Sequence, residues 1–361
     1  MKILTITGIR PDFIRMSKIF KKFDENFEHI LVHSGQHYDK MLSDVFFEEL
    51  QIRKPDYNLD IGGPGKEHFH QAADLSIKII ELIRKENLNP DLIVFLGDSN
   101  SVVCSVPLKK EGFKIAHIEA GMRSYDRRML EETNRVVCDH CSEYLFVYHE
   151  NYKEKAIKEN IDPNRIFVVG NTIVEVAREM QKKVYKQPKQ YSHIILDIHR
   201  PENFKYRERL ENIILYANDT METFDAPIKM LTFGRTEQSI KDFNINLGEI
   251  ELIPLMSFKN YIQSIYDSVC LISDSGTAQE EPALFGIPVI VPRDFTERPE
   301  SVMYDCSYMI DVNTKYNDTW IDSYNYITSI LNGNRKIDPS WLGDGNTSQI
   351  IVDKIKELFN E

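Results

Sequence analysis

Short apolar runs alternate with amphipathic segments along almost the whole chain. In the first half, the runs with the length of buried strands are Lys2–Thr7, His29–His33, Leu92–Leu96, Lys114–Ile118, Tyr144–Val147 and Ile166–Val169. The segments with apolar residues at helical spacing between them are Phe13–Phe23, Asp39–Leu50, Phe69–Glu86 and Glu131–Cys141. Strands that alternate with helices in this way are typical of a doubly wound, mostly parallel sheet.

The same alternation restarts after a predicted helix, Asn171–Lys183, and a polar linker, Tyr185–Gln190. The expected strands of the second half are Ile194–Ile198, Ile228–Thr232, Ile250–Ile253, Val269–Ile272, Pro288–Val291 and Tyr308–Val312. A chain of 361 residues also exceeds what one hydrophobic core usually supports. We therefore predict an α/β protein with two Rossmann-like domains facing a cleft. Residues 1–172 form the first domain, on which an amphipathic helix within 346–361 packs back, and residues 173–345 form the second.

Composition excludes several classes of partner. The net charge of −12 argues against nucleic-acid binding, which needs a basic surface. Five cysteines without regular spacing suit a reducing compartment rather than a disulfide framework. The apolar stretch at the N-terminus is too short for a signal peptide, and no run approaches the length of a membrane span. We expect a soluble, cytoplasmic protein with no membrane partner.

The segment Ser273–Glu300 carries the strongest local signal for a ligand. It follows an apolar strand, turns at Ser275-Gly276-Thr277, and then predicts a helix over Gln279–Leu284. A turn of small residues at a helix start exposes backbone N–H groups that suit a phosphate. The next strand, Pro288–Val291, leads to Arg298. Phosphate donors, acidic acceptors and guanidiniums together indicate a nucleotide-sugar site, whereas an ordinary strand–loop–helix with surface charge is the plain alternative.

Acidic residues follow successive strands of the first half. Asp98 ends one strand, Glu119 ends the next, and Glu131 opens a helix. One such residue alone is often a helix N-cap, but three of them without a metal-ligand pattern indicate acid–base chemistry. Arg10 and Arg15, at the start of the first helix, are expected to face the cleft. In the second half His199 ends the first strand, where it is a candidate for phosphate contact or proton transfer.

These segments together match an ordered set of motifs that runs from the first strand to the last helix. The set comprises Gly8–Asp12 (G-x-R-P-[DE]), Gly35–His37 (G-Q-H), Gly97-Asp98, His117–Arg123 (H-I-E-A-G-M-R), Glu131–Arg135 (E-E-x-N-R), Gly170–Thr172, His199–Asn203 (H-R-x-E-N), Ser273–Gly276, Thr296–Glu300 (T-E-R-P-E) and Gly343–Gly345. With these motifs the chain resembles the non-hydrolysing UDP-N-acetylglucosamine 2-epimerases. The resemblance implies a glycosyltransferase-B-like fold, a homodimer, and conversion of UDP-GlcNAc to UDP-ManNAc without a metal or redox cofactor.

The resemblance also assigns roles residue by residue. It implies that the catalytic residues are Asp98, Glu119, Glu131 and His199, with the carboxylates moving protons and His199 on the phosphate side; which carboxylate is base and which is acid stays open. It implies that the substrate is bound by Arg10, Arg15, Tyr261, Ser275, Gly276, Thr277, Glu281 and Arg298. The implied reaction eliminates UDP across C1–C2, holds a 2-acetamidoglucal, and adds UDP back with the C2 proton on the other face.

Some positions depart from the family pattern. Thr277 stands where glycine is common, Phe233-Gly234-Arg235-Thr236 replaces H-P-R-T, and Leu130 replaces proline. These departures leave open a different UDP-2-acetamido sugar, such as a 2,3-diacetamido uronic acid or a deoxy sugar. The sequence also leaves open a glycosyltransferase of the same fold, a hydrolysing epimerase, and a sensor that binds the nucleotide sugar without turnover.

Overall fold

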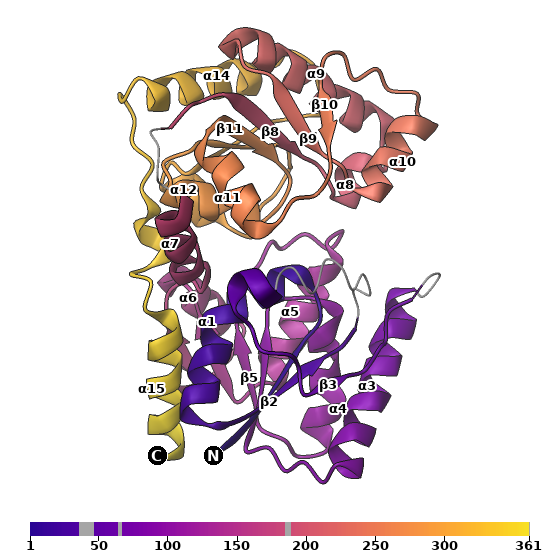
Figure 1. Ribbon diagram of the computed structural model, residues 1–361, viewed down its shortest axis with the longest axis vertical. Coiled ribbons are helices and arrows are strands. Elements are labelled where there is room, and N and C mark those ends of the chain that lie inside the picture. The colour runs from indigo at the N-terminus through magenta and orange to yellow at the C-terminus, as the bar shows by residue number, and fades with distance from the viewer. Residues whose placement is uncertain (36–46, 64–66, 185–188, 361) are drawn as a thin grey trace. The chain divides into compact units, whose positions relative to one another are not determined.

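The structure, a computed structural model, describes residues 1–35, 47–63, 67–184 and 189–360 (Figure 1). The chain divides into two compact units: a first unit, Met1–Val176 with Leu342–Glu361, and a second unit, Ala177–Trp341. The predicted helix Asp39–Leu50 begins outside the described residues, and Gln36, His37 and most of the predicted linker Tyr185–Gln190 also lie outside them.

The first unit is built on a parallel sheet. Among the described residues the sheet has seven strands in the order β3-β2-β1-β4-β5-β6-β7. Their bounds are β1 (Lys2–Thr7), β2 (Glu28–His33), β3 (Tyr57–Asn58), β4 (Leu92–Leu96), β5 (Ile115–Ile118), β6 (Tyr144–Val147) and β7 (Ile166–Val168). All of the predicted strands of this half are present, with ends that shift by a residue at most; the two-residue β3 was not predicted.

Helices pack against the first sheet. They are α1 (Arg10–Asn26), α3 (His68–Lys85), α4 (Ser105–Lys110), α5 (Leu130–Cys141), α6 (Glu150–Lys158) and the C-terminal α15 (Thr347–Phe359). The helix α7 (Ile173–Val184) carries the chain out of this unit. Helix α15 lies beside α1, where Lys356 Nζ donates to Asn26 Oδ1 at 2.7 Å (Figure 1). The end of the chain therefore returns to the first unit.

The second unit repeats the same design. Its described residues form a parallel sheet of six strands in the order β10-β9-β8-β11-β12-β13. The strands are β8 (His193–Asp197), β9 (Ile228–Leu231), β10 (Glu251–Ile253), β11 (Ser268–Ser273), β12 (Val289–Val291) and β13 (Ser307–Met309). The helices are α8 (Pro201–Phe204), α9 (Arg207–Phe224), α10 (Gly234–Asp242), α11 (Phe258–Tyr266), α12 (Glu281–Leu284), α13 (Pro299–Met303) and α14 (Asp318–Leu331).

Each sheet reverses its strand order at one point. The reversal lies between β1 and β4 in the first unit and between β8 and β11 in the second. Loops on the two sides of such a point diverge and leave a crevice outside the carboxyl ends of the strands, where doubly wound sheets bind ligands. The two reversal points are therefore the places to look for functional side chains.

The prediction of a continuous helix over Gln279–Leu284 is wrong. Thr277–Gln279 forms a short 3₁₀ turn, and α12 begins only at Glu281. The interruption falls at Glu280, whose φ of −110° and ψ of −58° depart from regular helix. Pro282 explains it, because proline lacks the N–H that would bond back to the previous turn and it crowds the residues before it.

No helix in the described ranges combines the length and the apolar character that a membrane crossing requires.

Candidate active site

In the first unit, the chain passes directly from β1 into α1 at the point where the sheet order reverses. Gly8 makes this turn possible, because a Cβ at this position would overlap the side chain of Ser34. Pro11 lies in the first turn of α1, where its missing N–H costs nothing. Arg10 is therefore the first helical residue and is half-buried, while Arg15, further along the helix, is buried.

The two predicted carboxylates Asp98 and Glu119 follow neighbouring strands. Leu96 of β4 pairs with Ile118 of β5, so the residues after them leave the sheet side by side. Asp98 forms an ion pair with Arg135, and its side chain keeps 24% of its surface exposed. Its neighbour Glu119 is buried. Two acidic groups are thus placed at one edge of the sheet, beside its reversal point.

The backbone of Glu119 adopts a left-handed conformation, with φ of 69°. Such a conformation costs a non-glycine residue on the order of 1–3 kcal/mol and is concentrated at functional sites. Here it is held by two hydrogen bonds, because the N–H groups of Glu119 and Ala120 both donate to the carbonyl of Phe146, at 3.1 and 3.3 Å. The strand end of β5 is therefore fixed in a shape that the sequence did not predict.

Arg15 pairs with Glu119 inside the protein. Its Nη1 lies 3.1 Å from Glu119 Oε2 and donates to Asn171 Oδ1 at 3.3 Å. The side chains of Arg15 and Glu119 are only 3% and 5% exposed. A buried charge is tolerated when it has a partner of opposite charge, and removing one partner leaves the other charge buried and uncompensated. The structure thus brings these two predicted residues together and orients the carboxylate through the guanidinium.

A third carboxyl group, Asp12, joins this cluster and was not assigned a role from the sequence. It is 4% exposed and accepts a hydrogen bond from Ser99 Oγ at 3.4 Å. Burial, followed by the negative charges of Asp98 and Glu119, raises the pKa of Asp12 well above its ordinary value, although backbone N–H groups of Gly8 and Ile9 partly oppose the shift. The signal in the sequence was its place in G-x-R-P-[DE], which identified a motif without indicating a buried acid.

Helix α5 brings the remaining acidic candidate, Glu131, to the same region of the first unit. Asn134 of this helix donates to the backbone carbonyl of Asp98 at 2.9 Å, and Arg135 binds the Asp98 side chain. The neighbouring Glu132 has a structural role, because its carboxylate lies 3.1 Å from Arg135 and accepts hydrogen bonds from backbone N–H groups of the preceding loop. Glu131, in the first turn, is half-buried. The helix is therefore tied to the loop that carries Asp98.

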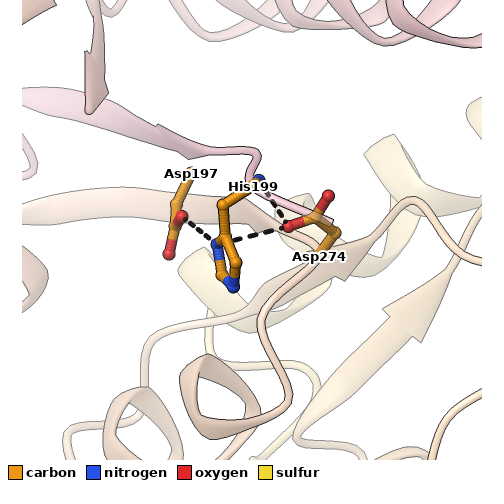
Figure 2. Close-up of side chains that lie close together, drawn as sticks. All are labelled: Asp197, His199 and Asp274. Atoms are coloured by element: carbon orange, nitrogen blue, oxygen red, sulfur yellow. Dashed lines mark hydrogen bonds and ion pairs between the residues drawn. The ribbon is translucent and has the colours of Figure 1, made fainter. Parts of the chain in front are cut away.

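In the second unit, His199 lies at the reversal point, just after β8 (Figure 2). Its Nδ1 is 3.0 Å from Asp197 Oδ1 and 3.5 Å from Asp274 Oδ1. Burial alone would lower the pKa of His199, but the two carboxylates outweigh it and raise the pKa above its ordinary value. The ring also packs on Phe233, with 4.9 Å between ring centroids.

The predicted phosphate turn follows β11. The N–H of Ser275 donates to Ser273 Oγ at 3.1 Å, and the hydroxyls of Ser275 and Thr277 lie 3.1 Å apart. Gly276 has φ of −63°, so its importance is space rather than conformation. A Cβ at Gly276 would overlap both the Glu297 carboxylate and the Arg298 guanidinium.

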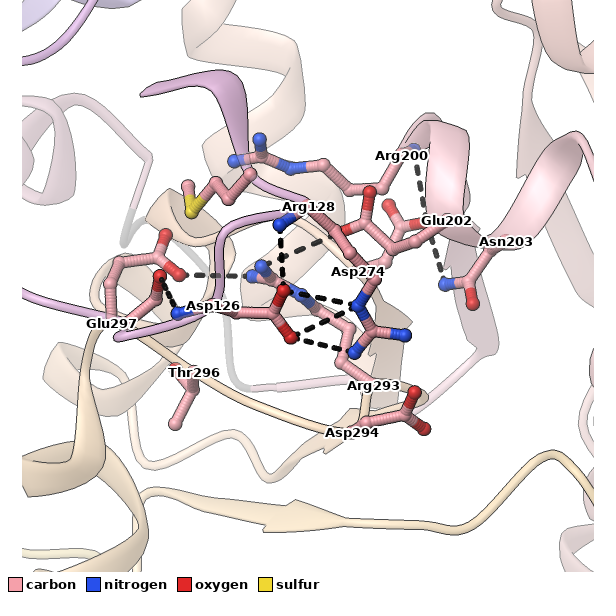
Figure 3. Close-up of polar contacts among 12 residues, drawn as sticks. Asp126, Arg128, Arg200, Glu202, Asn203, Asp274, Arg293, Asp294, Thr296 and Glu297 are labelled. Atoms are coloured by element: carbon pink, nitrogen blue, oxygen red, sulfur yellow. Dashed lines mark hydrogen bonds and ion pairs between the residues drawn. The ribbon is translucent and has the colours of Figure 1, made fainter. Parts of the chain in front are cut away.

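Buried charges surround Arg298, which is 2% exposed. Its guanidinium binds Glu280 through Nε and Glu297 Oε1 through Nη1, the second at 2.7 Å. Glu297 also accepts from Arg293 Nη1 at 3.1 Å, and Arg293 Nη2 lies 3.5 Å from Glu202 (Figure 3). Burying such a network costs desolvation free energy, and clusters of buried charges of this kind are common at functional sites. The sequence indicated the arginines and acids but not their pairing.

The last two predicted residues lie on helices of the second unit. Glu281 is buried and is the first residue of α12. Tyr261 is half-buried in the first turn of α11, which leads from β10 to β11 and therefore begins at the carboxyl edge of the sheet. All of the predicted residues of the second unit therefore lie in segments that begin at the carboxyl edge of this sheet. They are His199, Tyr261, Ser275, Gly276, Thr277, Glu281 and Arg298.

Comparison with known proteins identifies the family. The family model described as UDP-N-acetylglucosamine 2-epimerase matches residues 21–356. The chain is 34% identical over 330 residues to the UDP-N-acetylglucosamine 2-epimerase of Methanocaldococcus jannaschii, which covers 87% of this chain and 89% of that protein. It is also 33% identical over 325 residues to a UDP-2,3-diacetamido-2,3-dideoxy-D-glucuronate 2-epimerase of Pseudomonas aeruginosa, covering 86% and 88%.

Solved structures agree with this assignment. The crystal structure of the M. jannaschii UDP-GlcNAc 2-epimerase in complex with UDP-GlcNAc and UDP matches with a TM-score of 0.88 at 32% identity, covering 99% of this chain and all of that one. The predicted α/β, glycosyltransferase-B-like fold class is confirmed, and so are the predicted family and its class of enzyme, the isomerases. This chain belongs to the UDP-N-acetylglucosamine 2-epimerase family.

Proposed function

We propose that this protein inverts C2 of UDP-GlcNAc to give UDP-ManNAc without hydrolysing the sugar nucleotide. The observation that carries the proposal is the pair of carboxylates, Asp98 and Glu119, at the ends of neighbouring strands in a chain related to 2-epimerases. The C2 proton of the sugar is not adjacent to a carbonyl, so its direct removal is too unfavourable in free energy. Elimination of the anomeric substituent solves this problem.

In the proposed reaction a carboxylate removes the C2 proton while the C1–O bond breaks, and UDP leaves with the electrons of that bond. The product of this half is a 2-acetamidoglucal with a C1=C2 double bond. In the return half, a proton is added to C2 from the other face and a UDP oxygen attacks C1. Asp98, Glu119 and Glu131 of the first unit are the proton-transfer groups, and the ion pair with Arg15 orients Glu119 for this work.

The second unit is proposed to hold UDP while it is detached from the sugar. The hydroxyls of Ser275 and Thr277 and the guanidinium of Arg298 suit the diphosphate, and the Glu281 carboxylate suits the ribose hydroxyls.

Three further residues of the second unit are proposed to support this binding. Gly276 lets the turn approach Arg298, Tyr261 packs on the uracil, and His199 contacts phosphate. Arg10 of the first unit completes the diphosphate contacts. Fixed donors of this kind stabilise a departing anion without reorganisation.

The test is an NMR assay of UDP-GlcNAc in heavy water. Turnover through elimination exchanges the C2 proton, so we expect deuterium at C2 of the substrate pool and the appearance of UDP-ManNAc. Intact substrate without exchange would overturn the proposal. Release of free ManNAc and UDP would instead identify a hydrolysing epimerase, and turnover that requires a sugar acceptor would identify a glycosyltransferase.

A second substrate has specific support. The similarity to the P. aeruginosa UDP-2,3-diacetamido-2,3-dideoxy-D-glucuronate 2-epimerase, at 33% identity, is close to that of the M. jannaschii enzyme. The same chemistry applies to that sugar, because its C2 also carries an acetamido group. Parallel assays with both UDP-sugars decide between them: the true substrate is the one with the higher kcat/KM for C2 exchange.

The setting of the reaction follows from the family resemblance. We propose that the protein acts in the cytoplasm as a homodimer and supplies an N-acetylmannosamine donor for surface polysaccharide, with catalytic carboxylates in residues 1–172 and UDP-binding groups in residues 173–345. Light scattering coupled to size exclusion tests the dimer. A mass of 42.2 kDa, that of one chain, would contradict it.

A further inference from the structure

The loop that carries His199 is anchored by a carboxylate from a different strand. Asp274, which follows β11, accepts the backbone N–H groups of His199 and Arg200, each at 3.0 Å. It also accepts Asn203 Nδ2 at 3.0 Å, so both of its oxygens are occupied by donors from this one loop (Figure 3). Asp274 is fully buried. It therefore fixes where the His199 backbone lies relative to the edge of the sheet.

The histidine ring is oriented by Asp197, two residues earlier. One oxygen of this carboxylate lies 3.0 Å from His199 Nδ1 (Figure 2). The other oxygen accepts the Ser273 hydroxyl at 3.2 Å. The side chain of Asp197 is 7% exposed, whereas that of His199 is 28% exposed. Because an ionised carboxylate only accepts hydrogen bonds, Nδ1 must carry a proton and donate it. Within the described part of the chain, Nε2 makes no hydrogen bond.

We propose that Asp197 is the positioning residue of this site: it holds the ring through Nδ1 and leaves Nε2 as the nitrogen that meets the diphosphate of UDP. This inference rests on the proposed function for its ligand but on contacts within the second unit for its geometry. A histidine used in catalysis commonly has its other nitrogen fixed by a carboxylate, which selects the tautomer and orientation.

The charge balance around the ring favours the same role. Asp197 and Asp274 face the ring as anions, Arg200 opposes them as a cation, and the net result is a raised pKa of His199. A protonated ring presents an N–H at Nε2, which suits the negative charge that develops as UDP departs. A metal ion held by the same three side chains fits less well, because the Asp274 oxygens and Asp197 Oδ2 are already bound by N–H and O–H donors.

The test combines NMR titration of the histidine ring protons with pH profiles of C2 exchange for the full chain and its Asp197→Asn variant. The His199 signal is assigned as the one missing in His199→Gln. We expect Asp197→Asn to lower the pKa of His199, to move the alkaline fall of kcat to lower pH by the same amount, and to reduce kcat by about tenfold, below the 10²–10⁴ typical of proton transfer itself. Asp197→Glu, which keeps a carboxylate, should restore part of both effects.

The control is Glu237→Gln, which removes an acidic charge on the surface of α10, where Glu237 pairs with Lys241. It should leave both measurements unchanged. A folded Asp197→Asn protein with the wild-type His199 titration and pH profile would overturn the proposal. If Asp197→Asn does not fold, Ser273→Ala replaces it, because this change frees one Asp197 oxygen while keeping the charge. Ser273 Oγ also accepts the Ser275 N–H, so the readout for this variant is the His199 titration rather than kcat, and a wild-type titration would overturn the proposal. A wild-type protein without epimerase activity refutes the proposed function, while the titration still decides the position of His199.

Discussion

At the scale of single residues, Asp98 is the carboxylate best suited to a direct test. It is partly exposed, and its partner Arg135 stays paired with Glu132 at 3.1 Å when the Asp98 charge is removed. Asp98→Asn should therefore fold normally but lose about 10²–10⁴-fold in kcat, because it cannot accept a proton. Steady-state epimerisation with thermal unfolding measures both.

The matched control for this change is Asp91→Asn, just before the opposite, amino end of the same strand, where Asp91 accepts the Lys2 N–H at 2.7 Å. It should keep its activity. An Asp98→Asn protein with full activity would contradict the epimerase mechanism and would favour a glycosyltransferase.

Asp12 and Asp24, both on α1, should affect stability with opposite signs as the pH changes. Burial and the neighbouring carboxylates raise the pKa of Asp12 above 3.8, so the folded protein holds this proton more tightly than the unfolded chain and loses stability as pH rises above that value. Burial alone would raise the pKa of Asp24 too, but hydrogen bonds from His29 and Arg53 lower it, so its contribution to stability is present above 3.8 and is lost as pH falls.

The measurement is the melting temperature between about pH 2 and pH 8, a range that includes the pH values on both sides of 3.8 at which these two carboxyls change their contribution. The melting temperature of Asp12→Asn relative to that of the wild type should increase as pH rises, because the change removes a carboxyl that resists ionisation. The relative melting temperature of Asp24→Asn should decrease over the same rise, because the change removes a carboxylate stabilised by His29 and Arg53. Parallel curves for the two variants would show that these environments are not as described.

The sequence predicted which residue types gather at the strand ends, but not how they pair. Asp98, Glu119 and His199 could be proposed as site residues because each lies at or just after the end of an apolar run. Asp12 and Asp197 could not, because their roles depend on burial and on partners from other strands: Asp12 on the charges after β4 and β5, Asp197 on a histidine ring and a serine of β11. Pairing across a sheet is a property of the register, which a single sequence does not state.

At the scale of elements, the turn after β11 depends on one position without a side chain. Gly276→Ala would push a Cβ into Glu297 and Arg298, so we expect a loss of about 1–3 kcal/mol in the free energy of unfolding and at least tenfold weaker UDP binding. Gly234→Ala is the control, because a Cβ there meets nothing within 4 Å. Denaturant unfolding and calorimetric UDP binding distinguish the two, and equal behaviour of the variants would exclude a packing role for Gly276.

Among the described residues, elements with a strong apolar pattern were predicted well, and the wrong prediction of a continuous helix over Gln279–Leu284 has a local cause. Strands such as β4 and β11 are buried along their length, so their apolar runs identify them without ambiguity. The segment after β11 was harder, because its glutamates and alanine suggest a helix while Pro282 prevents a continuous one. Boundaries set by one residue's backbone are less predictable than elements set by many side chains.

Helix α15 offers a matched pair of neighbouring residues. Ile351 is completely buried, whereas Ile350 is 38% exposed. Ile351→Ala should cost about 2–5 kcal/mol in unfolding free energy, because it leaves a cavity against the first unit. Ile350→Ala should cost under about 1 kcal/mol, since less apolar surface is lost and alanine favours the helix. Similar values for both would mean that α15 does not dock through this face.

At the scale of the whole molecule, the proposed mechanism assigns different chemical tasks to the two units. The acids Asp98, Glu119 and Glu131 belong to the first unit, whereas the groups proposed to hold UDP belong almost entirely to the second. The second unit is one continuous stretch with its own sheet and its own apolar core, which includes Ile194, Leu196 and Trp320. The first unit is discontinuous, because it needs the returning helix α15.

This division predicts that a fragment of residues 177–341 folds alone and binds UDP without catalysing C2 exchange. Its affinity should fall below that of the full chain, because the contact proposed for Arg10 is missing. Binding should persist, because the residues proposed to hold UDP in the second unit, Ser275, Thr277, Glu281 and Arg298, are all present. Calorimetry with UDP and heavy-water NMR with UDP-GlcNAc measure the two properties on the same sample. Gly276→Ala in the fragment should weaken its UDP binding as in the full chain. A folded fragment that does not bind UDP would refute the assignment of nucleotide binding to the second unit, and exchange by the fragment would refute the role of the carboxylates in the first.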